Sequence, residues 1–259
     1  MQSWTLITGA SEGLGVEFAR IAASEGRNLI LTARSRDKLE ALANDLRSDH
    51  VEVAVIPADL SDEDEAARLW VEATKNRKID VIVNNAGLGR HGALADQGGW
   101  ARELSSIMVN TVALTYLTKR GAQHMLQHGG GTILNVASTA AFMPGPNMAV
   151  YHATKAFALS LSEAVAEELR GTGVSVTALC PGATQTEFFD AADMHGVRLL
   201  KLGKPMAARP VAQAGWDAAL KGRRLIVTGL LNKLFALSPR ITPRRLVTRI
   251  ASAVMGKAQ

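Results

Sequence analysis

Tyr151 and Lys155 are the residues of this 259-residue chain whose types and spacing most directly suggest chemistry. They lie in the segment NMAVYHATKAFALS (147–160), whose small apolar residues predict a helix. Side chains four residues apart on an α-helix lie on the same face. An ammonium beside a phenol favours the phenolate and lowers the phenol pKa from about 10. Such a tyrosine can donate a proton to a carbonyl oxygen or accept one from an alcohol, although a surface pair without chemical function has the same spacing.

A glycine-rich turn is predicted near the start of the chain, in TGASEGLG (8–15), where a strand ends and a helix begins. Gly9, Gly13 and Gly15 allow a tight turn and close backbone approach to a pyrophosphate, whose charge the helix N-terminus stabilises. A simple tight turn is the alternative. The strand before and the helix after it favour dinucleotide binding.

The end of the next strand bears on which dinucleotide binds. The strand ends Thr32-Ala33-Arg34, and Arg34 follows Gly15 by 19 residues. A carboxylate at this place binds the ribose 2′-hydroxyl of NAD, whereas an arginine suits the 2′-phosphate of NADP. The sequence therefore favours NADP(H) over NAD(H), with a solvated charge as the other interpretation of Arg34.

Short apolar strands alternate with helical segments along the chain, which indicates a parallel sheet covered on both faces. We expect strands at residues 3–8, 28–33, 51–56, 79–84, 132–137, 174–180 and 223–228, and helices at 13–25, 36–48, 61–75, 100–128 and 149–170. The prediction is an α/β fold: a single doubly wound Rossmann-type domain over 1–259, with a mostly parallel seven-stranded sheet.

Taken together, the motifs resemble those of the short-chain dehydrogenase/reductase family, in its single-domain branch of about 250 residues. They occur in family order over nearly the whole chain: TGASEGLG (8–15), ADL (58–60), NNAG (84–87), Asn110, Ser138, YHATK (151–155) and PGATQT (181–186).

The resemblance implies a role for each of four catalytic residues. Tyr151 would be the general acid/base, and Lys155 would lower its pKa and bind the nicotinamide ribose. Ser138, at the end of the fifth strand, would orient the substrate carbonyl. Asn110 would hold a water that links Lys155 to solvent.

It also implies the residues that bind the dinucleotide. Asp59 and Leu60 would border the adenine, and Thr184 and Thr186 would contact the nicotinamide carboxamide or the pyrophosphate. The implied cofactor-binding set is Gly9, Ser11, Gly13, Leu14, Gly15, Arg34, Asp59, Leu60, Asn85, Ala86, Gly87, Tyr151, Lys155, Pro181, Gly182, Thr184 and Thr186. Asn84 is equally well explained as a structural tie between strands. Glu12 departs from the family pattern, because many NADP-preferring members have a basic residue there.

Composition narrows the class of protein. A hydrophobic fraction of 47% with 20% charged residues fits a soluble globular protein, and a lone Cys180 favours a reducing, cytoplasmic location. The six histidines show no metal-ligand spacing, so no metal is expected. From Lys221 onward there are nine Lys and Arg and no Asp or Glu, whereas the preceding residues carry 20 basic against 24 acidic side chains. This distribution argues against nucleic-acid binding. A homodimer or homotetramer is expected from the family alone.

Two variable regions would shape the substrate site. Residues 187–210 would form a flap, with an apolar cover from Phe188, Phe189, Met194, Leu199 and Leu200. Phe142, Met143 and Met148 would form an opposite wall, which suggests a hydrophobic substrate.

Residues 230–259 are predicted to be a basic amphipathic C-terminal extension. Its last helix has an apolar stripe of Leu246, Val247, Ile250 and Val254, and arginines elsewhere. Such a helix can contact an anionic membrane peripherally, or its stripe can pack on its own domain or a sister subunit.

The leading interpretation is an NADP(H)-dependent oxidoreductase that interconverts a carbonyl and a secondary alcohol on a hydrophobic small molecule. A non-catalytic dinucleotide-binding regulator and a membrane-surface lipid or acyl reductase are the alternatives.

Overall fold

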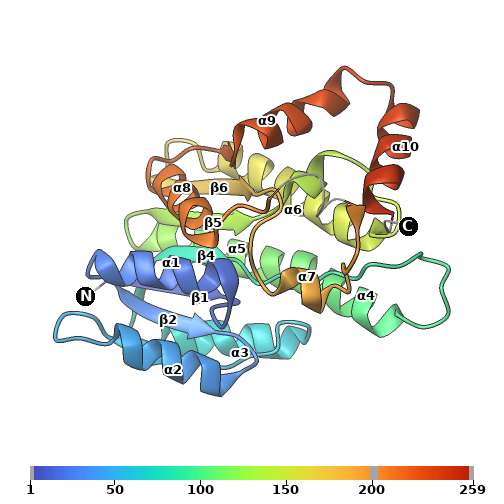
Figure 1. Cartoon of the computed structure of the whole chain (residues 1–259). Helices are drawn as coiled ribbons and strands as arrows, with labels where there is room; N and C mark the ends of the chain where they lie inside the picture. Colours follow the sequence, from blue (N-terminus) through green and yellow to red (C-terminus); the bar gives the residue numbers. More distant parts are fainter. Residues whose placement is uncertain (1–2, 199–203, 257–259) are drawn as a thin grey trace.

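A seven-stranded parallel sheet forms the centre of the computed structural model, which describes residues 3–198 and 204–256 (Figure 1). Its strand order is β3-β2-β1-β4-β5-β6-β7. The strands are β1 (Ser3–Thr8), β2 (Asn28–Thr32), β3 (Val53–Val55), β4 (Lys78–Asn84), β5 (Gly131–Val136), β6 (Val174–Cys180) and β7 (Leu225–Val227). The predicted fold class is confirmed, although β3 and β7 are shorter than their apolar runs suggested.

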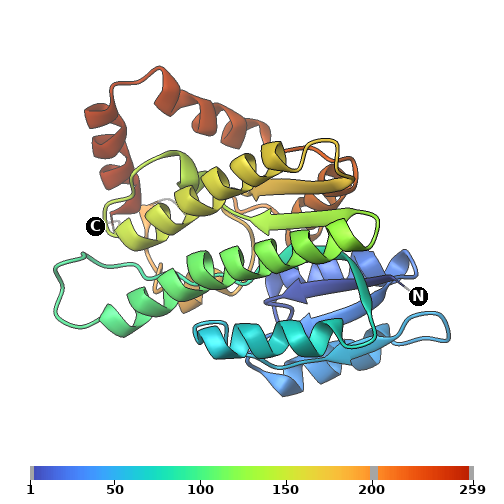
Figure 2. The ribbon, with the colours of Figure 1, turned by 180° about the vertical axis from the view of Figure 1, so that it is seen from behind.

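Helices cover both faces of this sheet. One face carries α1 (Gly13–Ser24), α2 (Arg36–Leu46) and α8 (Ala208–Leu220), and the other carries α3 (Glu63–Thr74), α4 (Trp100–Ile107), α5 (Leu114–Gln127) and α6 (Ala149–Glu168). Figure 2 shows the second layer, from cyan to yellow. Phe18 and Trp216 are buried in the first layer, and Leu69 and Leu117 in the second. Because both faces are covered, strands such as β2 are buried at every residue.

Among the described residues, three further α-helices lie beyond these two layers, in the segments that follow β6 and β7. They are α7 (Phe188–Ala191), α9 (Leu230–Leu237) and α10 (Arg244–Met255). Within the described residues no helix is long and apolar enough to cross a membrane.

The predicted helix over 100–128 is interrupted. Between α4 and α5 the chain forms a π-helical stretch, Met108–Ala113, which contains Asn110. Such widened turns are often found at functional sites. The side chain of Asn110 is buried here and bonds to neighbouring segments, and nothing in the helical periodicity of 100–128 predicts the widening.

A buried polar network joins the central strands to the second helical layer. Asn84 of β4 donates to Asn135 Oδ1 of β5 at 2.8 Å and to Thr118 Oγ1 of α5 at 3.2 Å. Asn135 in turn donates to Ser162 Oγ of α6 at 2.9 Å. Asn84 is therefore a tie between strands, the structural interpretation that its sequence context allowed.

We expect Asn135→Val to lower the free energy of unfolding by about 2–4 kcal/mol, because the buried Asn84 amide loses one of its two acceptors and the buried Ser162 hydroxyl loses its donor. Urea unfolding followed by circular dichroism measures the change. Thr132→Val is the matched control, since Thr132 lies on the same strand but is only half-buried, and within the described residues its hydroxyl has a single partner, Ser175 Oγ at 3.3 Å. Equal losses for both variants would contradict the role of the network.

Candidate active site

The cavity that gathers the predicted site residues lies at the carboxyl ends of the strands, where the sheet order reverses between β1 and β4. Ligands of open α/β sheets bind at this reversal. The cavity has a volume of about 1090 Å³ and is lined by the segments that follow all seven strands and by the start of α6.

The glycine loop fits a dinucleotide. Gly9 and Gly13 have φ of +63° and +54°, and a Cβ on Gly9 would lie 2.9 Å from Ala86 Cα. No side chain caps the N-terminus of α1, so its first amides are left for an anionic ligand. A Cβ on Gly15 would lie 2.1 Å from the Gly9 oxygen, so Gly15 serves packing within the loop and does not line the cavity.

Asn85 holds the glycine loop in place. Its side chain donates to the Thr8 oxygen at 2.9 Å and the Gly9 oxygen at 3.1 Å. In return, Thr8 Oγ1 accepts from the backbone amides of Asn85 and Ala86 at 3.0 and 2.9 Å. The loops after β1 and β4 thus form one rigid floor for the cavity.

The end of the cavity formed by the segments after β2 and β3 is charged. Arg34, Asp59 and Leu60 line it, and their contacts with an adenosine stay a prediction. Lys38 donates to Glu12 at 2.7 Å and to Glu187 at 3.5 Å, so the unexpected acid at position 12 is paired. Burial would raise the pKa of Glu12, but its hydrogen bonds with Lys38 and Glu187 and the nearby Arg34 lower it.

Tyr151 and Ser138 lie close together in the wall of the cavity. The Ser138 hydroxyl accepts from the Ala140 amide at 3.1 Å. Ser138 stands at the start of a 3-10 turn, Thr139–Phe142, directly after β5. Phe188 of the flap packs against the Tyr151 ring with centroids 5.1 Å apart.

Lys155 lies beneath the Tyr151 ring and is 4% exposed. Its Nζ is 5.8 Å from the ring centroid and donates to the Val136 oxygen at 2.8 Å. A Cβ on Gly87 would lie 3.1 Å from this Nζ, so only glycine leaves the ammonium open to the cavity there. Burial lowers the pKa of Lys155 to about 8, and nearby Cys180 opposes this.

The direction expected for the Tyr151 pKa is wrong for this structure. Burial raises the pKa of Tyr151 to about 12, and the nearby Ser138 hydroxyl offsets this rise only in part. The ammonium of Lys155 points toward the Val136 carbonyl, and loss of water around the phenol outweighs any attraction from that charge. The phenol is therefore protonated at neutral pH.

Asn110 does not line the cavity. Its amide bonds both backbone groups of Leu88, at 2.8 and 2.9 Å, and the Thr154 hydroxyl at 2.9 Å. These contacts fix the β4–α4 loop (85–99) against α6. The predicted role of Asn110 in holding a water stays a prediction.

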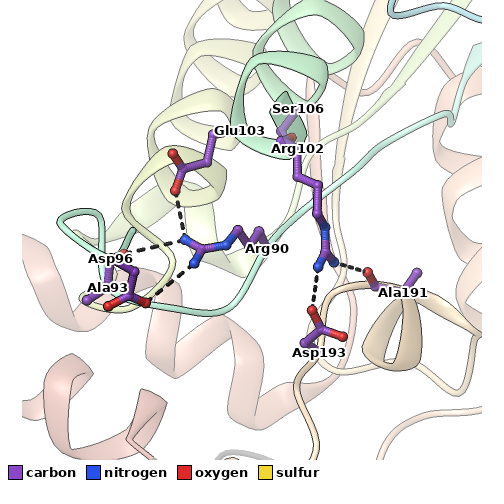
Figure 3. Close-up of polar contacts among 8 residues, drawn as sticks. All are labelled: Arg90, Ala93, Asp96, Arg102, Glu103, Ser106, Ala191 and Asp193. Carbon is purple, nitrogen blue, oxygen red and sulfur yellow. Dashed lines mark hydrogen bonds and ion pairs between the residues drawn. The ribbon is translucent and has the colours of Figure 1, made fainter. Parts of the chain in front are cut away.

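That loop is a hub which the sequence did not reveal. Arg90 donates to Glu103 of α4 at 3.0 Å and to Asp96 at 3.4 Å. Next to the loop, Arg102 of α4 donates to Asp193 and to the Ala191 oxygen of the flap (Figure 3). The Arg90 and Glu103 side chains are 13% and 10% exposed, so the pair is largely shielded from water.

The same loop reaches two more elements of the site. The backbone amide of His91 donates to the Ala192 oxygen at 2.8 Å, and its Nε2 donates to the Met255 oxygen of α10, also at 2.8 Å. Gly92 bonds the Asn147 oxygen just before α6 at 2.8 Å. One loop thereby joins the flap, the last helix and the start of the catalytic helix.

The predicted substrate walls are found in part. Met143, Met148, Phe188, Phe189 and Met194 line the cavity. Phe142 does not: it turns into the core formed by residues such as Leu114 and Ala158, because the 3-10 turn directs it away. Leu199 and Leu200 lie outside the described residues.

Helices α9 and α10 form part of the cavity wall, which the sequence did not predict. Leu230, Leu231, Phe235, Val247, Ile250, Ala251, Val254 and Met255 all line it. Every predicted cofactor-binding residue except Gly15 lines the cavity as well, together with Ser138, Tyr151 and Lys155. Among the described residues, no cluster of three or more His, Cys, Asp and Glu could hold a metal ion.

Comparisons with known proteins agree with this arrangement. Residues 3–195 match the family model of the short chain dehydrogenases. A short-chain dehydrogenase from Sphingobium yanoikuyae, solved with NADPH, is 32% identical, with a TM-score of 0.82 over 93% of each chain. A short chain dehydrogenase/reductase from Burkholderia phymatum, solved with NAD, is 25% identical, with a TM-score of 0.82 over 100% of this chain and 98% of that one. The very-long-chain 3-oxoacyl-CoA reductase of Rattus norvegicus is 27% identical over 92% of this chain and 76% of its own.

The chain belongs to the short-chain dehydrogenase/reductase family. Membership supports an enzyme that transfers a hydride between a nicotinamide dinucleotide and a carbonyl or alcohol.

The lowered pKa of Lys155 predicts a pH-dependent stability. In the unfolded chain lysine titrates near pH 10.4, so between about pH 8 and 10.4 the unfolded state binds more protons and the folded state gains stability as pH rises. Relative to Lys155→Met, the free energy of unfolding of the wild type should rise by up to about 3 kcal/mol across this range. Urea unfolding at both ends of the range measures it. The difference in free energy of unfolding between the wild type and Lys119→Met, a change at an exposed site of α5, should not vary with pH. If the difference between the wild type and Lys155→Met were also constant over this range, the low pKa of Lys155 would be contradicted.

Proposed function

We propose that this protein is an NADP(H)-dependent oxidoreductase that interconverts a ketone and a secondary alcohol on a bulky, apolar molecule. The observation that carries the proposal is the meeting of Ser138, Tyr151 and Lys155 in one cavity with the glycine loop. A regulator that only binds dinucleotide has no need of a serine hydroxyl beside Tyr151, which disfavours that alternative.

Tyr151 acts as the general acid in the direction of reduction. Its phenol is protonated at neutral pH because burial raises its pKa to about 12, so it has a proton to give to a carbonyl oxygen. Ser138 donates to the same oxygen and orients it. NADPH, when bound, supplies the hydride. In the direction of oxidation the phenol must first lose its proton, so alkaline pH favours that reaction.

Lys155 has two tasks at the cavity floor. With a pKa lowered to about 8 it is mostly cationic at neutral pH, and it stabilises negative charge that develops on the tyrosine oxygen. The nicotinamide ribose would lie on the side of the Lys155 ammonium that faces Gly87, where the absence of a side chain leaves room. Burial without an acidic partner makes this cation responsive to any anionic or polar ligand.

The preference for NADP rests on Arg34. Ala33 stands where a carboxylate would bind a ribose hydroxyl, and Arg34 and Ser35 line that end of the cavity. Glu12 would repel a phosphate, but Lys38 already neutralises it at 2.7 Å. Arg34 takes part in no ion pair within the described residues, so its guanidinium is available for a 2′-phosphate.

The cavity supports a large apolar substrate. Its substrate end is lined by Met143, Met148, Phe188, Phe189 and Met194, and α9 and α10 add further apolar side chains. The likeness to a reductase of very-long-chain 3-oxoacyl-CoA is consistent with a long or bulky carbonyl compound.

The proposal includes a cytoplasmic homodimer or homotetramer. Leu104 of α4 and Phe157 of α6 are 41% and 42% exposed on the outer helical layer, where a sister subunit would cover them. Cys180 is buried and burial raises its pKa to about 12, so the thiol is unreactive and fits a reducing compartment.

Tyr151→Phe should reduce kcat for ketone reduction by about a hundredfold to ten-thousandfold, because the acid is lost while the ring and its packing on Phe188 remain. The dissociation constant for NADPH, measured by fluorescence titration, should stay nearly unchanged. Tyr116→Phe removes the other phenol, on α5 and outside the cavity, and should leave kcat as it is. Turnover that survives in Tyr151→Phe would refute the acid/base assignment.

Arg34→Ala should raise KM for NADPH about tenfold to a hundredfold, because a charge-assisted contact to the 2′-phosphate is lost, and should change KM for NADH little. Steady-state kinetics with each cofactor test this. Arg36→Ala removes an equal charge two residues away, on the exposed surface of α2, and serves as the control. An equal effect on both cofactors would show that Arg34 does not distinguish them.

A further inference from the structure

The α9–α10 arm, residues 230–255, has an inner and an outer side. Figures 1 and 2 show it in red, standing away from the sheet beyond its β7 edge. The inner side is anchored: Val247, Ala251 and Met255 are buried, and Met255 packs with Met148 and Met194. His91 and the backbone of Arg198 hold the end of α10 through hydrogen bonds of 2.8 and 3.0 Å.

Exposed apolar side chains concentrate on the rest of the arm. Of the 15 large hydrophobic side chains that are exposed among the described residues, eight lie between positions 230 and 250. They are Leu230, Leu231, Leu234, Phe235, Leu237, Ile241, Leu246 and Ile250, with exposed fractions from 48% to 84%. An apolar surface this dense on a soluble domain marks a contact site.

The same segment is strongly basic. Five exposed cations, at Lys233, Arg240, Arg244, Arg245 and Arg249, accompany the apolar side chains, and the arm has no Asp or Glu. None of the five forms an ion pair within the described part of the chain. Basic side chains around exposed Leu, Ile and Phe complement an anionic phospholipid surface, where the cations meet head groups and the apolar groups enter the acyl boundary.

A second copy of the chain fits this surface less well. An isologous dimer through the arm would place five cations opposite the same five, without an acidic residue on either arm to neutralise them. A bilayer supplies the negative charge that the arm lacks.

The apolar surface continues into the cavity. Leu230, Leu231, Phe235 and Ile250 are exposed and also line the cavity, so they form part of its rim. We propose that the arm docks on an anionic phospholipid bilayer and that an apolar substrate passes over this rim from the lipid into the active site. The docking step stands on the arm itself, whereas the entry step rests on the proposed function.

Vesicle sedimentation tests the docking. The wild type should bind vesicles of two parts phosphatidylcholine to one part phosphatidylserine, and bind pure phosphatidylcholine much more weakly. The double variant Arg244→Gln/Arg245→Gln should lose about thirtyfold in partition coefficient on the mixed vesicles. Lys75→Gln/Lys119→Gln removes two exposed charges from α5 and the end of α3 and should bind like the wild type.

A second pair of variants tests the contribution of the apolar side chains to vesicle binding. Leu234→Ser/Ile241→Ser changes exposed residues that do not line the cavity and should weaken vesicle binding about tenfold or more. Val71→Ser/Leu126→Ser, at exposed sites of α3 and α5, is the control. Absence of wild-type binding, or arm variants that bind like the wild type, would overturn the docking. A change in oligomeric mass by analytical ultracentrifugation without vesicle binding would assign the surface to self-association instead.

Rates of ketone reduction test substrate entry from lipid separately from docking. All four variants should reduce a water-soluble ketone at the wild-type kcat/KM, which also shows that they fold. With a long-chain ketone dissolved in the mixed vesicles, only the two arm variants should be slow, by about tenfold. Equal rates on the vesicle-borne ketone would overturn entry from lipid. If the wild type bound vesicles but reduced no ketone at all, the proposed function and the entry step would fail while docking would stand.

Discussion

The burial of the Lys155 ammonium under Tyr151 is the constraint around which this structure is arranged. A cation that is 4% exposed, with the Val136 carbonyl at 2.8 Å and no carboxylate against it, destabilises the folded state at neutral pH. Hydrogen bonds in the surrounding elements offset this loss of stability. The floor of the site is fixed by Thr8, Asn85 and Asn110, and the network of Asn84 and Asn135 ties the strands beneath it. The buried Lys155 therefore lowers the stability of the fold, and the hydrogen bonds around the site raise it again.

Much of this could be predicted from the sequence, for identifiable reasons. Apolar runs of five or six residues mark strands that are buried on both faces, and all seven were placed within a few residues. The glycine turn was predicted because its conformation demands Gly9 and Gly13, and both have positive φ. Helical spacing paired Tyr151 with Lys155, and the family resemblance added Ser138 at the end of the fifth strand; all three line the cavity.

Other features were beyond sequence reasoning because they depend on packing in three dimensions. The i, i+4 spacing of Tyr151 and Lys155 gives proximity but not solvent exposure, and it is burial that raises the tyrosine pKa to about 12. The hub formed by Arg90, His91 and Arg102 joins segments up to 164 residues apart, which no local pattern reveals. Phe142 illustrates the same limit, since a single 3-10 turn decides whether it faces substrate or core.

The arm of α9 and α10 shows why an amphipathic pattern alone underdetermines function. The predicted stripe of α10 contains Val247, which packs inward, and Leu246 and Ile250, which remain 48% exposed. Packing on the domain and contact with a lipid surface were therefore not exclusive alternatives. Because Ile250 also lines the cavity, the side of the helix that would meet lipid merges with the side that would meet substrate. An arm with this much exposed apolar surface needs a partner that covers it in water, and an anionic bilayer would match both its apolar side chains and its positive charge.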